Sequence, residues 1–452
     1  MTVSEIQALL QQRQSGKVKF AFTDVDGVLR GKIISVQKLL DVLEHGSGFC
    51  DVVFGWDVND QLYAEGVQLT GWHTGFPDQF CRIDLQTFRN IPWQNEMPFF
   101  IADFEGSKAG DHACPRSLLK RIAGQAAEMG YVPRFSQEFE WFNFAETPAS
   151  LAAKQYQTPT PLTPGMFGYS VLRPSQHYDF NKALFDQLTS FGVPLEGLHT
   201  ETGPGVYEAA IHHDVVLAAA DKAALFKAGV KEIASQFGIM ASFMAKWNQQ
   251  LPGCSGHLHQ SLWDEGQQRN LFFDGSDTHQ MSALQQHYVA GLLYCLPHLM
   301  PMYAPTINSY KRLVEGAWAP TTISWGIENR TSAVRIINHH EKGARAELRV
   351  PGSDSNPYLA MAAALASGLY GIRNKIPLRL KMTEGNAYAN EGNLPLHSNL
   401  LDATHAMQQS ALAKELLGEA FVDHFTATRL HECRQYNNAV TDWELKRYFE
   451  II

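Results

Sequence analysis

The chain lacks basic blocks, long apolar runs and paired-cysteine motifs, and each absence removes a class of function. Lys and Arg number 37 against 46 Asp and Glu, and the resulting net charge of -9 argues against nucleic acid or an anionic membrane surface as the main partner. The most apolar segment, Tyr358 to Ile372, is interrupted by Ser367 and Gly368. It is shorter than the roughly 20 residues of a membrane span, so we predict a buried helix and no membrane partner.

The six cysteines are scattered without CxxC spacing, which is typical of reduced thiols in a cytoplasmic protein rather than of a disulfide framework or a zinc site. A Walker phosphate loop is absent, because Gly27 to Lys32 has the wrong spacing and lacks the following Ser or Thr. No internal repeat or low-complexity tract indicates a solenoid or a fibrous assembly. The polar segment Thr2 to Arg13 predicts a helix with a Thr2/Glu5 capping box, not a signal peptide.

The composition that remains is that of an ordinary globular protein: 452 residues, 45% hydrophobic and 18% charged, enough for two or three domains. Strand-like runs at Val18 to Asp24 and Val28 to Ser35 flank Asp26-Gly27, a dipeptide that favours a tight hairpin turn. A small sheet begins here. We expect it to continue through Phe49 to Asp60 and Phe80 to Asp103.

The pattern changes near residue 108, where we place a boundary between domains 1–108 and 109–452. Ser117 to Met129 predicts an amphipathic helix that begins near Pro115 and ends at Gly130. Beyond it strands and helices alternate. The predicted strands are Val132 to Phe144 and Ser255 to Trp263, the predicted helices are near Ser175 to Phe191 and Asp214 to Phe237, and the predicted loops are Lys154 to Pro164 and Asn386 to Ser398.

Two carboxylates, Glu138 and Glu140, share one face of the first of these strands, while Phe139 and Trp141 occupy the other. Like charges this close cost free energy unless a cation lies between them or one carboxyl group takes a proton. A bound metal ion is the economical explanation. An exposed acidic strand face is the alternative.

Two further motifs offer metal-binding side chains. His257, His259 and Ser261 share one face of their strand, and a pair of histidines in this spacing is either a satisfied polar pair or part of a ligand set. Glu201 and Glu208 flank a Gly-Pro-Gly turn, where glycines let the backbone approach a ligand, although an ordinary surface turn has the same pattern. Carboxylates with one histidine and no thiolate favour Mg²⁺ or Mn²⁺ over zinc, which implies phosphate chemistry.

The stretch Arg345 to Val350 has one charged and one apolar strand face. Arg345, Glu347 and Arg349 point one way and the intervening residues point the other, a pattern shared by half-exposed strands in general. Other arginines lie close by in the sequence. Guanidinium forks of this kind suit phosphate and carboxylate recognition, and the set comprises Arg312, Arg330, Arg335, Arg345 and Arg349.

These motifs together resemble the glutamine synthetase family over about residues 112–445. The resemblance rests on Gln137 to Glu140, Glu201 to Glu208, His257 to Ser261 and Arg345 to Asn356. It implies an α+β fold, with an N-terminal β-grasp-like domain and a catalytic domain that has a curved antiparallel sheet flanked by helices.

Position by position, the resemblance implies a role for each matched residue. Glu140, Glu201 and Glu208 match one metal site, and Glu138, His257 and Glu347 match a second. His259 and Ser261 match residues near the nucleotide. The remaining matches are Arg330, Arg335 and Arg345 on the phosphates, with Arg330 also catalytic, and Gly253, Arg312 and Arg349 at the glutamate substrate.

The implied reaction is ATP-dependent amide formation with two Mg²⁺ or Mn²⁺ ions. The γ-carboxylate of glutamate attacks the γ-phosphate, and an amine or ammonia displaces phosphate from the acyl phosphate. Asp57 resembles the aspartate that members lend to a neighbouring subunit's site, although a surface aspartate is the competing interpretation. A homo-oligomer, the family's dodecamer of stacked hexameric rings, is the implied assembly.

The chain departs from the family at the loop from Lys311 to Pro320. Trp318 stands where ammonia-using members carry a glutamate that binds ammonium and removes its proton. Tryptophan cannot accept that proton, but it offers an apolar, π-rich wall for a larger amine. We therefore predict a γ-glutamyl amide ligase with Trp318 at the amine site. The alternatives are an ammonia-using glutamine synthetase with Glu315 as the base, and a catalytically silent scaffold.

A second departure lies beside the histidines. Pro252 replaces an asparagine that contacts glutamate in the family, while Gly253 is kept. The resemblance therefore leaves the acid substrate open.

Overall fold

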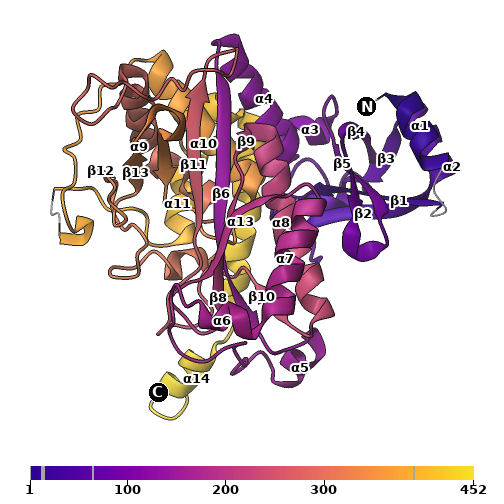
Figure 1. The fold of residues 1–452 in the computed structure, drawn as a ribbon. Helices are drawn as coiled ribbons and strands as arrows, with labels where there is room; N and C mark the ends of the chain where they lie inside the picture. Colours follow the sequence, from indigo (N-terminus) through magenta and orange to yellow (C-terminus); the bar gives the residue numbers. More distant parts are fainter. Residues whose placement is uncertain (1, 12–15, 64–65, 390–391) are drawn as a thin grey trace.

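The computed structural model describes residues 2–11, 16–63, 66–389 and 392–452, and it contains two sheets (Figure 1). Part of the predicted N-terminal helix and of the predicted loop from Asn386 to Ser398 falls outside these residues. The described part of that helix, α1 (Val3–Gln11), begins with the expected capping box, in which Thr2 and Glu5 exchange hydrogen bonds of 2.7 and 3.3 Å.

The smaller sheet has five strands in the order β2-β1-β5-β4-β3. Its β1–β2 hairpin turns at Gly27, whose φ of 83° is one that glycine adopts without strain. Alternate strand residues such as Phe20 and Phe22 are buried against helix α2 and its neighbours in a separate core. The elements are β1 (Lys17–Thr23), β2 (Leu29–Ser35), α2 (Val36–His45), β3 (Ser47–Cys50), η1 (Asp51–Phe54), β4 (Asp78–Ile91), η2 (Pro92–Gln94) and β5 (Met97–Asp103).

The prediction of a strand through Phe49 to Asp60 was wrong beyond Cys50, where the chain enters the short helix η1. The reason is local hydrogen bonding. The backbone N–H of Asp51 donates to Pro77, and the buried Asp51 carboxylate accepts a 2.5 Å hydrogen bond from Thr70. These contacts satisfy the polar groups that a strand would have paired with a neighbour.

The larger sheet has nine strands, with the path β12-β13-β14-β11-β6-β8-β7 and with β9 and β10 paired to β6. Its pairs are antiparallel except for β12 with β13. The central strand β6 covers the predicted range. The strands are β6 (Val132–Phe144), β7 (Leu195–Thr200), β8 (Val206–Ile211), β9 (Asp214–Val215), β10 (Met240–Ser242), β11 (Gly256–Trp263), β12 (Trp325–Ile327), β13 (Val334–Ile337) and β14 (Arg345–Leu348).

Helices cover one side of this sheet and form the main core with it (Figure 1). Helix α8 packs on β6, where Phe226 stacks on Phe139. Helix α10, predicted as a buried segment, is buried along almost its whole length. The helices are α3 (Lys108–His112), α4 (Pro115–Glu128), α5 (Pro148–Ala153), α6 (Leu172–Gln176), α7 (Tyr178–Ser190), α8 (Val216–Gln236), α9 (Ala283–Tyr303), η3 (Ser309–Lys311), η4 (Glu341–Gly343), α10 (Pro357–Arg373), η5 (Ala387–Ala389), α11 (Leu400–Gln408), α12 (Ala411–Leu417), α13 (Glu419–Asn438) and α14 (Asp442–Tyr448).

A buried arginine links the smaller sheet to helix α8, which packs on the larger sheet. Arg116 on α4 bonds Asp103 of β5 at 2.6 Å and Asp221 of α8 at 2.9 Å. The smaller core also takes in Ala109 and Ala113, so the division at residue 108 stays a prediction. In the described ranges no helix is both long enough and apolar enough to cross a membrane.

Candidate active site

The acidic face of the larger sheet is built around β6. Glu138 and Glu140 point to this face, while Phe139 and Trp141 are fully buried in the core on the other. The antiparallel register places His257 of β11 opposite Glu138 and Glu208 of β8 opposite Glu140. Strand alternation and register thus bring together motifs that are far apart in the sequence.

Strand β14 extends the acidic face. Glu347 lies opposite His259 on one neighbour and opposite Arg335 on the other, while Ala346 and Leu348 are buried in the core. The exposed fraction of Glu347 is 1%. The alternative of a half-exposed charged strand face is therefore wrong for Glu347.

The first cluster on this face brings Glu138, His259 and Glu347 within metal-binding reach of one another. His257 lies among them, with Nδ1 3.3 Å from Glu347 Oε1 and 3.5 Å from Glu138 Oε1. Both ring nitrogens of His257 are buried without a hydrogen-bond partner in the described part of the chain. Unpaired imidazole nitrogens between carboxylates fit a divalent cation.

Arg345 distinguishes the two histidines. Its Nε donates a hydrogen bond to His259 Nδ1 at 3.1 Å, which leaves the proton of a neutral His259 ring on Nε2, 3.4 Å from Glu138 Oε2. A protonated nitrogen cannot be a metal ligand. This geometry favours His257 over His259 as the ligand.

The second cluster consists of His199, Glu201 and Glu208, again within metal-binding reach of one another. His199 Nε2 lies 3.3 Å from Glu208 and 3.8 Å from Glu201. His199 was missed in the sequence, although its position opposite Glu208 on β7 and two residues before Glu201 could have marked it. Tyr169 stacks on the His199 ring with centroids 4.6 Å apart, which fixes the orientation of the ring.

Glu140 borders the second cluster, but its carboxylate is already engaged. It accepts hydrogen bonds from the Ser255 backbone N–H at 2.9 Å and from Ser255 Oγ at 2.5 Å. The turn between Glu201 and Glu208 packs closely against β6. A Cβ on Gly205, where φ is 74°, would lie 2.5 Å from the carbonyl oxygen of Asn143, so this glycine lets the turn approach β6.

The carboxylates carry more negative charge than the site neutralises. Burial, followed by repulsion from Glu138, Glu140 and Glu201, raises the pKa of Glu208 to about 11. Burial opposes ionisation of Glu347, but the charges of Arg349, His257 and His259 together outweigh it and lower the pKa of Glu347 to about 2. A proton or a cation at Glu208 would relieve this repulsion.

Three predicted arginines reach the first cluster. Arg335 bonds Glu347 Oε2 at 3.0 Å, Arg349 bonds Glu347 Oε1 at 2.5 Å, and Arg345 contacts His259 as described above. Arg330 is exposed in the loop between β12 and β13.

A cavity of about 270 Å³ adjoins the first cluster. It contains the predicted nucleotide residues His259 and Ser261, and Ser261 Oγ accepts a 3.0 Å hydrogen bond from Trp263. The cavity also contains Arg134 and Lys342, two cations that the sequence analysis did not select. These cations suit an anionic ligand.

Arg312 is buried beside the same face. Its Nη2 donates to the carbonyl oxygens of Val350 at 2.6 Å and Pro351 at 2.8 Å. A Cβ at Gly253 would lie 2.5 Å from Arg312 Cγ, so only glycine admits the arginine side chain in this position. Pro252 is the residue directly before Gly253 in the chain.

The loop that carries Trp318 lies against Arg349, whose Nη2 is 3.4 Å from the carbonyl oxygen of Trp318. The Trp318 side chain is 65% exposed, and its φ is 56°. Tyr388 fixes the next residue, because its hydroxyl donates to the carbonyl oxygen of Ala319 at 3.0 Å. Glu315 is exposed on the same loop.

Asp57 lies in the N-terminal part of the chain. Its carboxylate accepts hydrogen bonds from the backbone N–H groups of Asn59 and Gln61 and lies 3.6 Å from His431 of α13. Within one chain the structure therefore brings Asp57 to a turn and to α13, whereas the matched metal and phosphate positions gather on the acidic face.

The chain is similar to known proteins in sequence and in structure. Residues 112–448 match the family model "Glutamine synthetase, catalytic domain". The chain is 51% identical over 439 residues to "Type-1 glutamine synthetase 2" of Dictyostelium discoideum, an alignment that covers 96% of this chain and 84% of that protein. It is 34% identical over 454 residues to "Glutamate--isopropylamine ligase" of Pseudomonas sp, which covers 100% of this chain and 98% of that protein.

The fold agrees with a solved structure. The structure "GmaS/ADP complex-Conformation 1" superposes with a TM-score of 0.84 and is 27% identical, covering 98% of this chain and 99% of that one. The α+β architecture expected from the sequence is confirmed.

Proposed function

Because the chain belongs to the glutamine synthetase family, we propose that it is an ATP-dependent ligase that joins the γ-carboxylate of glutamate to a primary amine. The observation that carries the proposal is the contact between Arg349 and the carbonyl oxygen of Trp318. It brings the backbone of residue 318 against the acidic face, and the resemblance places a glutamate that serves ammonia at this position.

We assign two divalent ions, Mg²⁺ or Mn²⁺, to the acidic face. Glu138, His257 and Glu347 would hold one ion, and the unpaired nitrogens of His257 support this set. Glu140, Glu201 and Glu208 would hold the other, with His199 as a neighbour. The ions would neutralise phosphate charge as it shifts between oxygens.

The arginines would bind the anionic groups of the substrates. Arg330, Arg335 and Arg345 would contact phosphates, and the cavity beside His259 and Ser261 has room for part of a nucleotide. Arg312 and Arg349 would hold the glutamate carboxylate, with Gly253 keeping Arg312 in place. These groups orient the γ-carboxylate for attack on phosphorus, which gives an acyl phosphate.

The exposed Trp318 ring would pack against the carbon skeleton of the amine. Ammonia is the second candidate, because the relative that is 51% identical bears a glutamine synthetase name. In that case Glu315, three residues earlier, would supply the carboxylate that Trp318 lacks.

We also propose a homo-oligomer built on the family pattern, a dodecamer of stacked hexameric rings, in which residues 1–108 lend Asp57 to the neighbouring subunit. Two inactive variants, Asp57→Ala and Glu347→Ala, test this when co-expressed. Mixed oligomers should regain activity because some sites combine an intact Asp57 with an intact Glu347. No recovery would contradict subunit sharing.

The proposed reaction is tested by phosphate release with purified protein, ATP, Mn²⁺ and glutamate, with isopropylamine or ethanolamine as acceptor. We expect phosphate in proportion to a γ-glutamyl amide identified by mass spectrometry. Glu341→Gln, on the exposed helix η4, is the control variant. An inert protein with all substrates present would contradict the proposal.

A further inference from the structure

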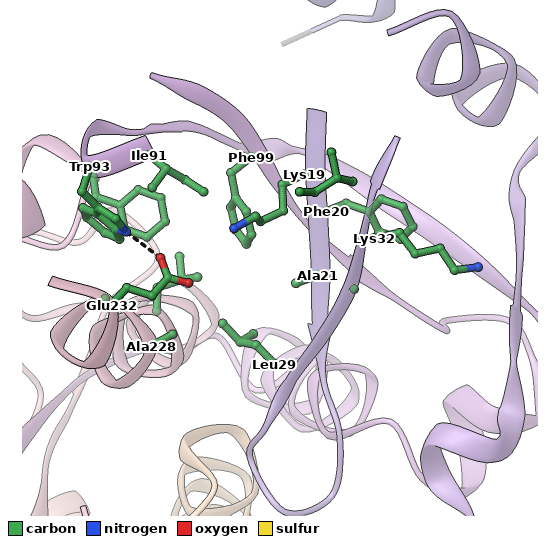
Figure 2. A pocket seen from close by; sticks show the side chains of 15 residues that line it. Lys19, Phe20, Ala21, Leu29, Lys32, Ile91, Trp93, Phe99, Ala228 and Glu232 are labelled. Carbon is green, nitrogen blue, oxygen red and sulfur yellow. Dashed lines mark hydrogen bonds between the residues drawn. The ribbon is translucent and has the colours of Figure 1, made fainter. Parts of the chain in front are cut away.

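A cavity of about 220 Å³ lies between the N-terminal sheet and helix α8 (Figure 2). It contains none of the residues assigned above to metal, nucleotide, glutamate or amine. Its walls are mostly apolar and come from both sides of the junction, and they include Phe20, Ile91, Phe99, Phe191, Leu225 and Ala228.

One end of this cavity is polar. Glu232 Oε2 accepts a hydrogen bond from Trp93 Nε1 at 2.5 Å (Figure 2). It accepts a second one from Gln94 Nε2 at 2.9 Å. Lys19 Nζ donates to Gln94 Oε1 at 2.7 Å. Among the described residues no donor reaches Glu232 Oε1, and Lys19 uses one of its three N–H groups. A free acceptor and free donors therefore remain at this end.

The second lysine of the wall does not share this arrangement. Lys32 Nζ lies 4.2 Å from the centroid of the Phe49 ring and points away from Glu232 in Figure 2. Lys19 extends toward the Glu232 end. The cavity thus has one cation and one anion at the same end, with apolar walls beyond them.

Size and charge limit the ligand. A cavity of about 150 Å³ holds benzene, and pockets for drug-sized ligands begin at about 300 Å³. This cavity lies between those sizes. A ligand with both an anionic and a cationic group would pair with Lys19 and with Glu232, whereas a ligand with only one charge would pair with one of them.

We propose that this cavity binds a small zwitterion, an α-amino acid with an apolar side chain, whose carboxylate pairs with Lys19 and whose ammonium group pairs with Glu232. Its side chain fills the apolar walls. The proposal does not depend on the ligase function. Because Phe226 of α8 stacks on Phe139 of β6, a ligand on α8 lies one layer behind the acidic face.

Calorimetric titration of the full chain with L-leucine, without ATP and with EDTA, tests the proposal. We expect saturable binding. The single-charge analogues 3-methylbutylamine and 4-methylpentanoate should each bind at least tenfold more weakly. No binding of leucine, or equal binding of either analogue, would overturn the proposal.

Variants locate the binding. Lys19→Met and Glu232→Gln should each weaken leucine binding at least tenfold, and Ala228→Leu should block it by filling the cavity. Glu128→Gln, exposed at the end of α4, is the matched control and should leave binding unchanged. Circular dichroism checks that each variant is folded. Unchanged affinity in folded Lys19→Met or Glu232→Gln protein would place leucine elsewhere and contradict the proposal.

Discussion

Arg349 Nη1 donates a hydrogen bond to Glu347 Oε1 across 2.5 Å, from two residues further along the same face of the sheet. Arg335 binds the other carboxylate oxygen at 3.0 Å. These guanidinium groups provide the positive charge that a buried carboxylate needs. Glu347 is thereby held ionised at the centre of the acidic face.

Replacing Glu347 with Ala should destabilise the protein by about 3–5 kcal/mol, because buried Arg349 would lose its partner. Urea unfolding monitored by circular dichroism measures the change. Glu341→Ala on exposed helix η4 should stay within about 0.5 kcal/mol of the parent protein. Equal stability of the two variants would show that the ion pairs of Glu347 with Arg335 and Arg349 contribute nothing to the free energy of unfolding.

Glu208 should make the metal-free protein less stable as pH rises. Its folded pKa of about 11 lies above the ordinary value of 4.5, so the folded state holds one more proton between these values. The free energy of unfolding then falls by up to about 1.4 kcal/mol per pH unit over this range. Urea unfolding in EDTA at pH 6, 7 and 8 should show this slope, and Glu208→Gln should reduce it. Identical slopes for the parent protein and for Glu208→Gln would contradict the assignment of this pH dependence to Glu208.

His424 should make the protein sensitive to acid. Burial, followed by the charges of His112 and Arg429, lowers the pKa of His424 from 6.5 to about 3. The neutral His424 ring does not reduce the free energy of unfolding above pH 6.5. As the pH falls from 6.5 toward 3, the free energy of unfolding decreases, and the decrease due to His424 is about 2 kcal/mol at pH 5.

The variant His424→Leu tests this directly, because both ring nitrogens lack hydrogen-bond partners within the described ranges and leucine sacrifices no bond there. The loss of stability between pH 7 and pH 5 should shrink by about 2 kcal/mol. His405→Leu, at an exposed position of α11, should keep the parent's pH dependence. A parent-like dependence in His424→Leu would contradict the prediction.

Replacing Trp318 with Glu should raise kcat/KM for ammonia by at least tenfold and lower it for isopropylamine, because a carboxylate would replace the aromatic wall. Phosphate release measures both. Trp318→Phe is the matched control and should keep the preference for the amine. An ammonia activity that does not rise would favour Glu315 as the existing base.

Much of the fold could be predicted from the sequence because local signals agree with the tertiary structure. Strand β6 alternates between half-buried and buried residues from Val132 to Trp141, and its limits match the prediction. The segment from Asp51 onward fails because a contact with Thr70, nineteen residues away, outweighs its apolar character.

The acidic face could be predicted only in part. Alternation shows which residues of a strand share a face, but not what lies opposite them. The register that pairs Glu140 with Glu208 on one side and His199 with Glu208 on the other depends on three strands at once. For the same reason the burial of Glu347 could not be inferred from its own segment.

The central claim is the choice of a primary amine over ammonia, and a competition measures it most directly. The protein, ATP, Mn²⁺ and glutamate are mixed with equal concentrations of isopropylamine and ammonium, and both products are quantified by mass spectrometry at early times. We expect γ-glutamyl isopropylamide to exceed glutamine at least tenfold. An excess of glutamine would contradict the claim and identify the protein as an ammonia-using enzyme.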